Sequence, residues 1–293
     1  MQVAILGCGY VGIALGVQLT DAGHDVVGVR RSDAGLDAIE AAGFDAVRAD
    51  LTDSASLSAV PDADWMVYAA SAGGRGADAA RTAYVDGLRT VVETLGARPS
   101  PPDRLVYTSS TGIYGDHGGD WVDESTVPEP ATDRQRTLLE AEEIALEETA
   151  ARGIDGTVVR FGGLYGPDRY RMDRYLDGPV TEGYLNSIHR DDAAGVVAHL
   201  LTTDRARGEV VLAVDDDPVS KWAFADWLAE QCGVSPPAKQ TVAERAATEG
   251  EVSRRVRASK RCANDRLHEL GYDLRYPSVR GGFRPAIEAF RAD

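Results

Sequence analysis

Residues 2–12 read QVAILGCGYVG, a short apolar run that passes directly into a glycine-rich turn. After the turn, apolar side chains such as Val11 and Ala14 recur at helical spacing as far as Gly23, which we expect to end the helix in a left-handed conformation. Another apolar run follows at 25–29. The stretch therefore predicts a strand, a tight turn, a helix and a second strand, the βαβ unit that opens a parallel sheet.

The three glycines of the turn follow the GxGxxG pattern, and each has a distinct use. Gly7 permits the tight turn, Gly9 lets the backbone approach a pyrophosphate, and Gly12 allows close packing of helix on strand. The N–H groups near Tyr10 and Val11 would then face phosphates at the positive end of the helix. The pattern predicts a dinucleotide site, against the alternative of a glycine-rich turn without a ligand.

The end of the second predicted strand bears on the choice between NAD and NADP. An NAD site places an acidic residue there to bind the ribose 2′-hydroxyl group. This chain has Arg30, Arg31 and Ser32 instead, and a guanidinium group binds a phosphate through two parallel hydrogen bonds. Asp33 lies slightly too far along to be the acidic partner. We predict NADP as the cofactor, with NAD as the alternative, in which one arginine is only a surface charge.

Strand and helix patterns continue to alternate along the chain. Helical segments are expected at 77–95 and 134–151, and Thr132 with Gln135 forms a capping box before the second of them. This alternation predicts an α/β fold, a Rossmann-type doubly wound parallel sheet with helices on both faces. The remaining candidate strands are 45–49, 64–69, 104–109, 156–161 and 209–214.

Two regions interrupt the alternation, a long polar loop at 115–133 and a tail from Pro236 in which strand patterns disappear. We predict a cofactor-binding core over residues 1–165, completed by 185–232. The segments 166–184 and 233–293 are expected to form a small C-terminal substrate lobe over the carboxyl edge of the sheet, where ligands of open α/β sheets bind.

The charge of the chain is strongly negative. It has 47 acidic and 31 basic residues, a net charge of −16, and only three of the basic residues are lysines. Such a charge repels itself in dilute buffer and is screened in concentrated salt, so we expect a halophilic protein of a salt-rich cytoplasm. An ordinary acidic protein is the alternative. Nucleic acid is excluded as a partner, and no apolar run is long enough for a membrane.

Cysteine and histidine usage gives no sign of a metal site. The three cysteines, Cys8, Cys232 and Cys262, are far apart, and neither a CxxC nor an HExxH pattern occurs. We expect a reducing cytoplasm and no structural metal.

Three further segments carry a family resemblance. Residues 106–115 read VYTSSTGIYG, residues 160–167 read RFGGLYGP, and residues 186–192 read NSIHRDD. Together with the glycine turn, they resemble the extended and atypical short-chain dehydrogenases/reductases, also called NAD-dependent epimerase/dehydratases, almost from end to end. The resemblance is specific for the fold and much less specific for the reaction.

The resemblance implies further cofactor contacts at the ends of the next strands. Asp50 and Leu51 would contact the adenine. The residues that would line the rest of the dinucleotide are Ala69, Ala70, Ser71 and Ser109.

The resemblance also implies that Ser110 is the catalytic serine, hydrogen-bonded to a substrate oxygen. The family's tyrosine and lysine, four residues apart, are missing: by spacing, Arg134 and Leu138 take their places, while Glu142 keeps the acidic residue one turn later. The chain thus resembles an atypical subgroup that lacks this acid–base pair.

Replacement proton donors are therefore considered. Tyr84 stands where the family has an asparagine near the active site, although packing on a helix face is the simpler explanation. Tyr114 is a weaker candidate, with a turn aromatic as its alternative. The loop residues Asp116 and His117 are weaker still. His189 and Asp192 are expected to orient the lobe.

Two functions remain open from the sequence. The first is an NADPH-dependent oxidoreductase or epimerase-like enzyme acting on a small carbonyl or sugar-derived substrate. The second is a catalytically silent NADPH-binding sensor or scaffold, because the phosphate loop is intact while the acid–base pair is missing. The helices at 77–95 and 134–151 resemble those that pair family members into homodimers.

Overall fold

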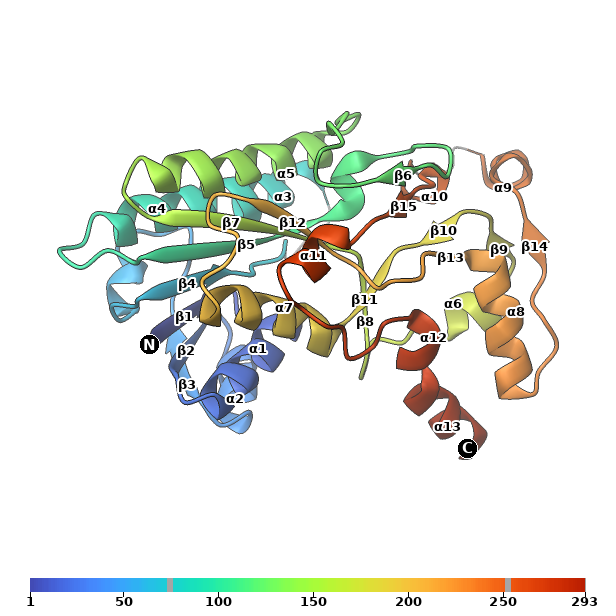
Figure 1. Ribbon diagram of the computed structural model, residues 1–293, viewed down its shortest axis with the longest axis horizontal. Helices are drawn as coiled ribbons and strands as arrows, with labels where there is room; N and C mark the ends of the chain where they lie inside the picture. Colours follow the sequence, from blue (N-terminus) through green and yellow to red (C-terminus); the bar gives the residue numbers. More distant parts are fainter. Residues whose placement is uncertain (73–75, 251–253, 293) are drawn as a thin grey trace.

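Seven parallel strands form one sheet at the centre of the molecule, shown in Figure 1 by a computed structural model that describes residues 1–72, 76–250 and 254–292. The strands lie in the order β12-β7-β5-β4-β1-β2-β3. From β1 the chain adds β2 and β3 on one side and then β4, β5, β7 and β12 on the other. The order thus reverses between β1 and β4, which opens a crevice at their carboxyl ends. The strands are β1 (Gln2–Leu6), β2 (Asp25–Arg30), β3 (Asp45–Arg48), β4 (Trp65–Tyr68), β5 (Arg104–Ser110), β7 (Asp155–Phe161) and β12 (Val210–Ala213).

The seven strands and the doubly wound fold predicted from the sequence are confirmed, each strand to within one residue at either end. The central strands are buried on both faces; β4, for example, is buried at every position. Parallel strands covered by helices on both sides need such continuous apolar runs.

Helices cover both faces of the sheet (Figure 1). One face carries α1 (Tyr10–Asp21), α2 (Asp33–Ala41) and α7 (Arg190–Thr202), whose apolar side chains join one hydrophobic core with β1 and β7. Gly23 adopts a φ of 85° after α1, as expected for a left-handed helix end.

The other face carries two long helices, each interrupted by one π-helical turn. The first consists of α3 (Ala77–Arg81), η2 (Thr82–Asp86) and α4 (Gly87–Gly96), and the second of α5 (Asp133–Glu143) and η4 (Ile144–Glu148). Both predicted helices are confirmed, and so is the capping box, in which Gln135 N–H donates to the Thr132 hydroxyl group at 3.2 Å. Their buried side chains form the second half of the core.

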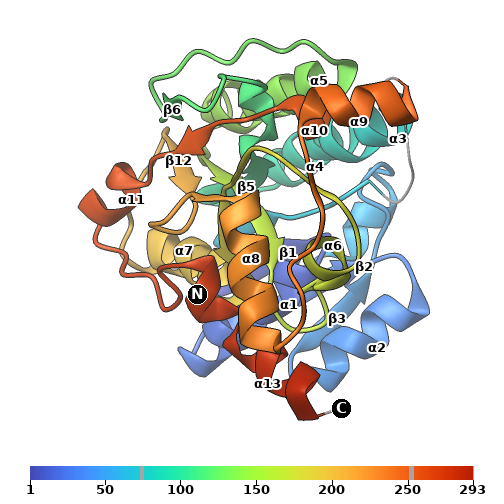
Figure 2. The ribbon, with the colours of Figure 1, turned by 90° about the vertical axis from the view of Figure 1, so that its right-hand side faces the viewer.

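A smaller lobe lies beyond the carboxyl edge of the sheet, and Figure 2 views the molecule from this side, with α8 in front. Its core includes Tyr165, Phe224, Leu228 and Phe283. The prediction assigned α8 to the first unit, but the structure packs it within the lobe. No helix in the described part of the chain is long and apolar enough to cross a membrane. The lobe helices are α6 (Asp173–Leu176), α8 (Lys221–Cys232), α9 (Val242–Glu249), α10 (Arg254–Arg257), α12 (Val279–Gly282) and α13 (Arg284–Ala292); α11 (Asp265–Glu269) lies beside β12.

Short strands tie the lobe to the sheet, although the sequence predicted none after Pro236. In the tail, β15 (Arg261–Cys262) pairs with β6 (Trp121–Val122) of the long loop. These strands have two residues each, too few to show any periodicity in the sequence. The other short pairs are β8 (Gly163–Tyr165) with β11 (Ser187–His189), β10 (Tyr184–Leu185) with β13 (Val219–Ser220), and β9 (Val180–Thr181) with β14 (Lys239–Gln240).

Candidate cofactor and catalytic site

The glycine turn connects β1 to α1 at the crevice. Gly7 has a φ of 79°, and its N–H and that of Cys8 both donate to the Val29 carbonyl group at 3.1 Å. A Cβ atom on Gly7 would lie 2.4 Å from the Cα of Ala70, so no larger residue fits. On Gly12 it would lie 3.0 Å from the Ile5 side chain, as expected for close packing of α1 on β1.

The first turn of α1 presents free backbone donors. Gly9 precedes the helix and has no side chain to cap it. The N–H groups of Tyr10, Val11 and Gly12 therefore have no partner within the helix. They point out of its positive end, where a phosphate is stabilised. The Tyr10 side chain reaches away to the lobe, where its hydroxyl group donates to the Pro167 carbonyl at 2.9 Å.

A cavity of about 500 Å³ opens beside the turn, at the carboxyl ends of β1 to β4. It is large enough for the adenosine half of a dinucleotide. Ala69 directly follows β4, and its N–H donates to the Leu6 carbonyl group at 2.8 Å; it does not line the cavity. The predicted cofactor residues that line the cavity are Gly7, Arg30, Arg31, Ser32, Asp50, Leu51, Ala70 and Ser71. The prediction missed Thr52, Tyr68, Ala79, Thr82 and Ala83, which also line it and belong to no recognisable motif.

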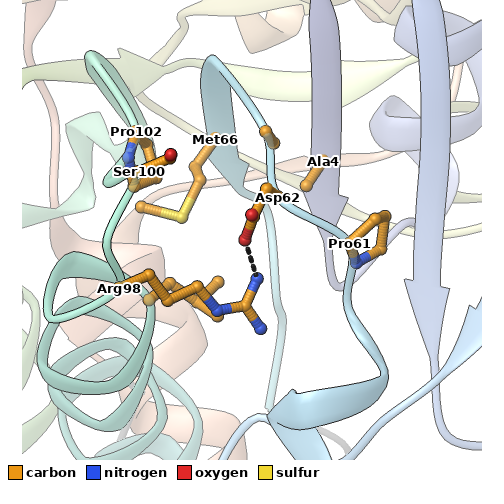
Figure 3. A pocket seen from close by; sticks show the side chains of 9 residues that line it. Ala4, Pro61, Asp62, Met66, Arg98, Ser100 and Pro102 are labelled. Carbon is orange, nitrogen blue, oxygen red and sulfur yellow. Dashed lines mark hydrogen bonds and ion pairs between the residues drawn. The ribbon is translucent and has the colours of Figure 1, made fainter.

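A second, shallow pocket lies at the opposite edge of the sheet (Figure 3). It is lined by residues that precede β4 and β5, and the ion pair of Arg98 with Asp62, 3.0 Å long, spans it. It encloses almost no volume. The cavity at the carboxyl edge is therefore the candidate site.

Of the two arginines that line the cavity, one forms an ion pair within the described part of the chain and the other does not. Arg31 lies 3.3 Å from the Asp50 carboxylate, whose pKa is held below its usual range, chiefly by a hydrogen bond from the Thr52 backbone N–H and also by Arg31. The Arg30 side chain has no carboxylate or hydrogen-bond partner among the residues that the structure describes. Its Nη1 lies 3.0 Å from where a Cβ of Gly9 would be, so the guanidinium group stands next to the phosphate turn.

The side chains of Ser32 and Asp33 bind parts of the chain at the start of α2. Ser32 accepts the Gly35 N–H at 3.3 Å and begins α2. Asp33 forms an exposed ion pair with Arg48. Asp33, the first carboxylate after β2, is thus paired with Arg48 and does not line the cavity.

Two predicted site residues belong instead to a buried network under α5. Ser109 was predicted to contact the cofactor, but its hydroxyl group donates to Glu142 at 2.5 Å. Glu142 forms a buried ion pair with Arg160, 2.6 Å long. Arg160 also donates to the Tyr114 hydroxyl group at 2.6 Å, and that hydroxyl donates to the Asp123 carbonyl at 2.7 Å.

This network changes the assignment of Ser109 and Tyr114. Burial is the main reason that the pKa of Tyr114 is raised, so the phenol stays protonated. Its proton is held by a carbonyl group of the chain, and its side chain is almost completely buried. We therefore correct both assignments: the two hydroxyl groups are structural, and Tyr114 is not placed to donate a proton to a ligand.

Ser110 lies at the end of β5, as the resemblance implied. Its side chain is partly exposed, and its Oγ accepts the Gly112 N–H at 3.1 Å, which leaves the hydroxyl proton available. This hydrogen bond fixes the serine at the start of the 3₁₀ turn Thr111–Tyr114. The site therefore keeps one oriented hydroxyl donor.

Tyr84 and Arg134 meet across two helices. Tyr84 is on η2, the turn whose residues Thr82 and Ala83 line the cavity, and Arg134 is in the first turn of α5. Arg134 donates to the Tyr84 hydroxyl group at 3.1 Å, and its guanidinium carbon lies 5.5 Å from the ring centre. Leu138, one turn further along α5, is buried. The structure therefore places a phenol and a cation together where the sequence lacks the family's pair.

The other candidates of the sequence bind parts of the chain. The Asp116 carboxylate accepts the N–H groups of Gly118 and Ser259, at 3.1 and 2.9 Å, and His117 contacts the Tyr114 carbonyl. His189 accepts the Asp191 N–H and so caps α7, and burial lowers its pKa.

Asp192 fixes the tail of the lobe. Its carboxylate accepts the N–H groups of Arg275 and Tyr276, at 2.8 and 2.9 Å, and the Tyr272 hydroxyl group at 3.1 Å.

The sheet order, the glycine turn and the cavity beside it define a protein of the Rossmann-type dinucleotide-binding class. The sequence profile of the NAD dependent epimerase/dehydratase family matches residues 3–215. The chain belongs to that family.

Three relatives span nearly the whole chain. Protein YeeZ of Escherichia coli strain K12 is 28% identical over 284 residues, 94% of this chain and 96% of YeeZ. The structure of a putative NAD-dependent epimerase/dehydratase from Methylobacillus flagellatus is 30% identical, with a TM-score of 0.78 over 100% of this chain and 99% of its own. Human epimerase family protein SDR39U1, solved with NADPH, shares the fold at 18% identity, with a TM-score of 0.76 over 98% of this chain and 99% of its own.

Proposed function

We propose that the protein is an NADP-dependent oxidoreductase or epimerase-like enzyme that acts on a small carbonyl or sugar-derived substrate, in a salt-rich cytoplasm. The observation that carries the choice of NADP is the pairing of charges around β2. Arg30 has no carboxylate partner in the described part of the chain, while Asp33 is bound to Arg48. An unpaired guanidinium group beside a cavity favours an added phosphate over a plain ribose hydroxyl group, because its hydrogen bond to the hydroxyl group has no opposite charge to strengthen it.

The residues present fit such a cofactor. Gly7 and Gly9 leave the backbone bare where a diphosphate would approach, and a side chain at Gly7 would collide with Ala70. The first-turn N–H groups of α1 would hold the diphosphate, and Arg30 with Arg31 would hold the 2′-phosphate. When bound, the nicotinamide ring supplies or accepts a hydride.

The chain's own residues would handle the substrate oxygen. Ser110 would donate a hydrogen bond to it and orient the carbonyl group. We propose Tyr84 as the group that gives or takes the proton. Arg134 donates a hydrogen bond to the Tyr84 hydroxyl group at 3.1 Å and so orients the phenol, as the missing lysine does elsewhere in the family.

Isothermal titration calorimetry with NADPH and NADH tests the choice of cofactor. We expect NADPH to bind at least tenfold more tightly than NADH. Arg30→Gln should weaken NADPH binding by about 10- to 100-fold, the loss of a charge-assisted bidentate contact, and leave NADH binding nearly unchanged. Arg266→Gln is the matched control, because it removes an arginine of α11 that pairs with Glu209. This variant should bind NADPH and NADH like the wild type. Equal or tighter binding of NADH would refute the proposal.

A further inference from the structure

The ring of Tyr10 joins the start of α1 to the lobe. Its hydroxyl group donates to the Pro167 carbonyl at 2.9 Å. Two arginines lie against the ring: the guanidinium carbons of Arg169, in the turn after β8, and of Arg190, at the start of α7, are 5.3 and 5.5 Å from its centre. Two cations thus gather around the side chain of the first residue of α1, the helix whose first turn presents free N–H groups.

The two arginines differ in their partners. Arg190 forms an ion pair with Asp191 at 2.9 Å, so its charge is compensated. Arg169 is exposed, and within the described ranges no carboxylate pairs with it. Arg169 thus shares the Tyr10 ring with a second cation and keeps its own charge uncompensated, so a bound anion would be stabilised there.

The backbone that carries Arg169 is held in uncommon conformations. Gly166 has a φ of 138°, and a Cβ there would lie 3.0 Å from the Tyr10 hydroxyl oxygen and 3.1 Å from Nε2 of His189. Asp168 and Arg171 have φ values of 62° and 54°, in the left-handed region that such residues seldom adopt. The Arg169 N–H closes the turn on the Gly166 carbonyl at 2.9 Å. Such strain persists where the surroundings fix it, and it collects at ligand clamps.

We propose that Arg169 binds the diphosphate of the dinucleotide from the lobe side, opposite the N–H groups of α1. The proposal rests on the proposed function, because it assumes a nicotinamide dinucleotide in the cavity. A guanidinium group matches two diphosphate oxygens. Tyr10 is a positioning residue: its ring holds the guanidinium group by a cation–π contact, and its hydroxyl group holds the turn.

Calorimetry with two ligands tests this inference. NADPH carries both the diphosphate and the 2′-phosphate, whereas adenosine 2′-monophosphate carries only the latter. Arg169→Gln should weaken NADPH binding about tenfold, the loss of one charge-assisted hydrogen bond, and leave adenosine 2′-monophosphate unaffected. Arg30→Gln should weaken both ligands.

Matched variants separate the contact from a general effect on the lobe. Arg174→Gln removes a nearby exposed arginine of α6 and should bind both ligands like the wild type. Tyr10→Phe keeps the ring and should keep most of the affinity, while Tyr10→Leu should lose as much NADPH affinity as Arg169→Gln. Melting curves check that every variant is folded.

Each outcome has one meaning. Unchanged NADPH binding by Arg169→Gln overturns the inference, and leaves the proposed function standing if Arg30→Gln still weakens both ligands. If Arg169→Gln lost equal affinity for NADPH and for adenosine 2′-monophosphate, the inference would also be overturned, since the effect would not be local to the diphosphate. Failure of the wild type to bind NADPH overturns both the inference and the proposed function.

Discussion

Tyr84 and Arg134 are the two side chains that we propose in place of the family's tyrosine and lysine. In the family pattern the phenol and its cation lie one turn apart on a single helix. Here the phenol is on η2 and the cation is at the start of α5, joined by a hydrogen bond of 3.1 Å. A π-helical turn displaces side chains relative to an α-helix and often occurs at functional sites, so the turn itself accounts for the position of Tyr84.

Removing the hydroxyl group of Tyr84 or of Ser110 distinguishes an enzyme from a silent sensor, because only an enzyme has a turnover rate to lose. Tyr84→Phe and Ser110→Ala should each lower kcat for NADPH oxidation by about 10²–10⁴-fold, the usual loss of a general acid or oriented donor. The Kd for NADPH should stay within about twofold, because neither hydroxyl group is required to hold the nucleotide. A panel of small carbonyl compounds, followed by the absorbance of the reduced nicotinamide, supplies the assay.

Tyr107→Phe is the matched control for Tyr84→Phe. Tyr107 lies close to Tyr84, but its hydroxyl group is buried with no hydrogen-bond partner in the described part of the chain. Its loss should change neither kcat nor the Kd. No turnover by the wild type with any member of the panel, together with tight NADPH binding, would favour the sensor and contradict the enzyme.

At the scale of elements, the sequence patterns predict the fold, whereas they predict the site only in part. Runs such as the one that forms β4 are apolar because both faces of the sheet are covered, and the glycine turn is required by the approach of Ala70 to Gly7. Two-residue strands such as β6 and β15 have no period to detect. The pairing of Glu142 with Arg160 depends on how α5 packs on β7, which spacing along the chain does not encode.

The packing of β7 against η4 gives a prediction about one glycine. A Cβ on Gly156 would lie 1.7 Å from the carbonyl oxygen of Ala145, a backbone atom that cannot rotate away. Gly156→Ala should therefore force helix and strand apart and lower the free energy of unfolding by about 3 kcal/mol. Urea denaturation measures the change.

Gly178→Ala is the control, because no atom lies within 4 Å of the Cβ it would add and its φ is not in the left-handed region. Its free energy of unfolding should stay within about 0.5 kcal/mol of the wild type. If the two variants were equally stable, the close contact between β7 and η4 would be wrong.

At the scale of the whole molecule, charge is the dominant feature. Sixteen excess negative charges are spread over a surface of 13321 Å². Many arginines already form ion pairs, for example Arg207 with Asp103 and Arg266 with Glu209. Exposed pairs of this kind contribute little, so they do not cancel the long-range repulsion among the remaining acids.

The melting temperature should therefore rise with salt. Between low and molar KCl the screening length falls from tens of ångströms to about 3 Å. We expect an increase of more than about 4 °C, equivalent to one or two kcal/mol for a domain of this size. Sucrose at matched water activity is the control for general exclusion of solute and should raise the melting temperature less. A melting temperature that does not respond to KCl would contradict the proposed adaptation to salt.

Because the tail binds Asp192, the sheet is completed before the tail is fixed when the protein is synthesised. The last strand of the sheet ends at Ala213, yet the backbone N–H groups that bind the buried carboxylate of Asp192 belong to Arg275 and Tyr276, about 60 residues further on. A nascent chain on the ribosome can thus complete its sheet while that carboxylate still lacks the tail and is open to water. Translation must pass Tyr276 before the tail can bind Asp192, and we expect a product cut short before that residue to be digested faster by a protease than the full chain.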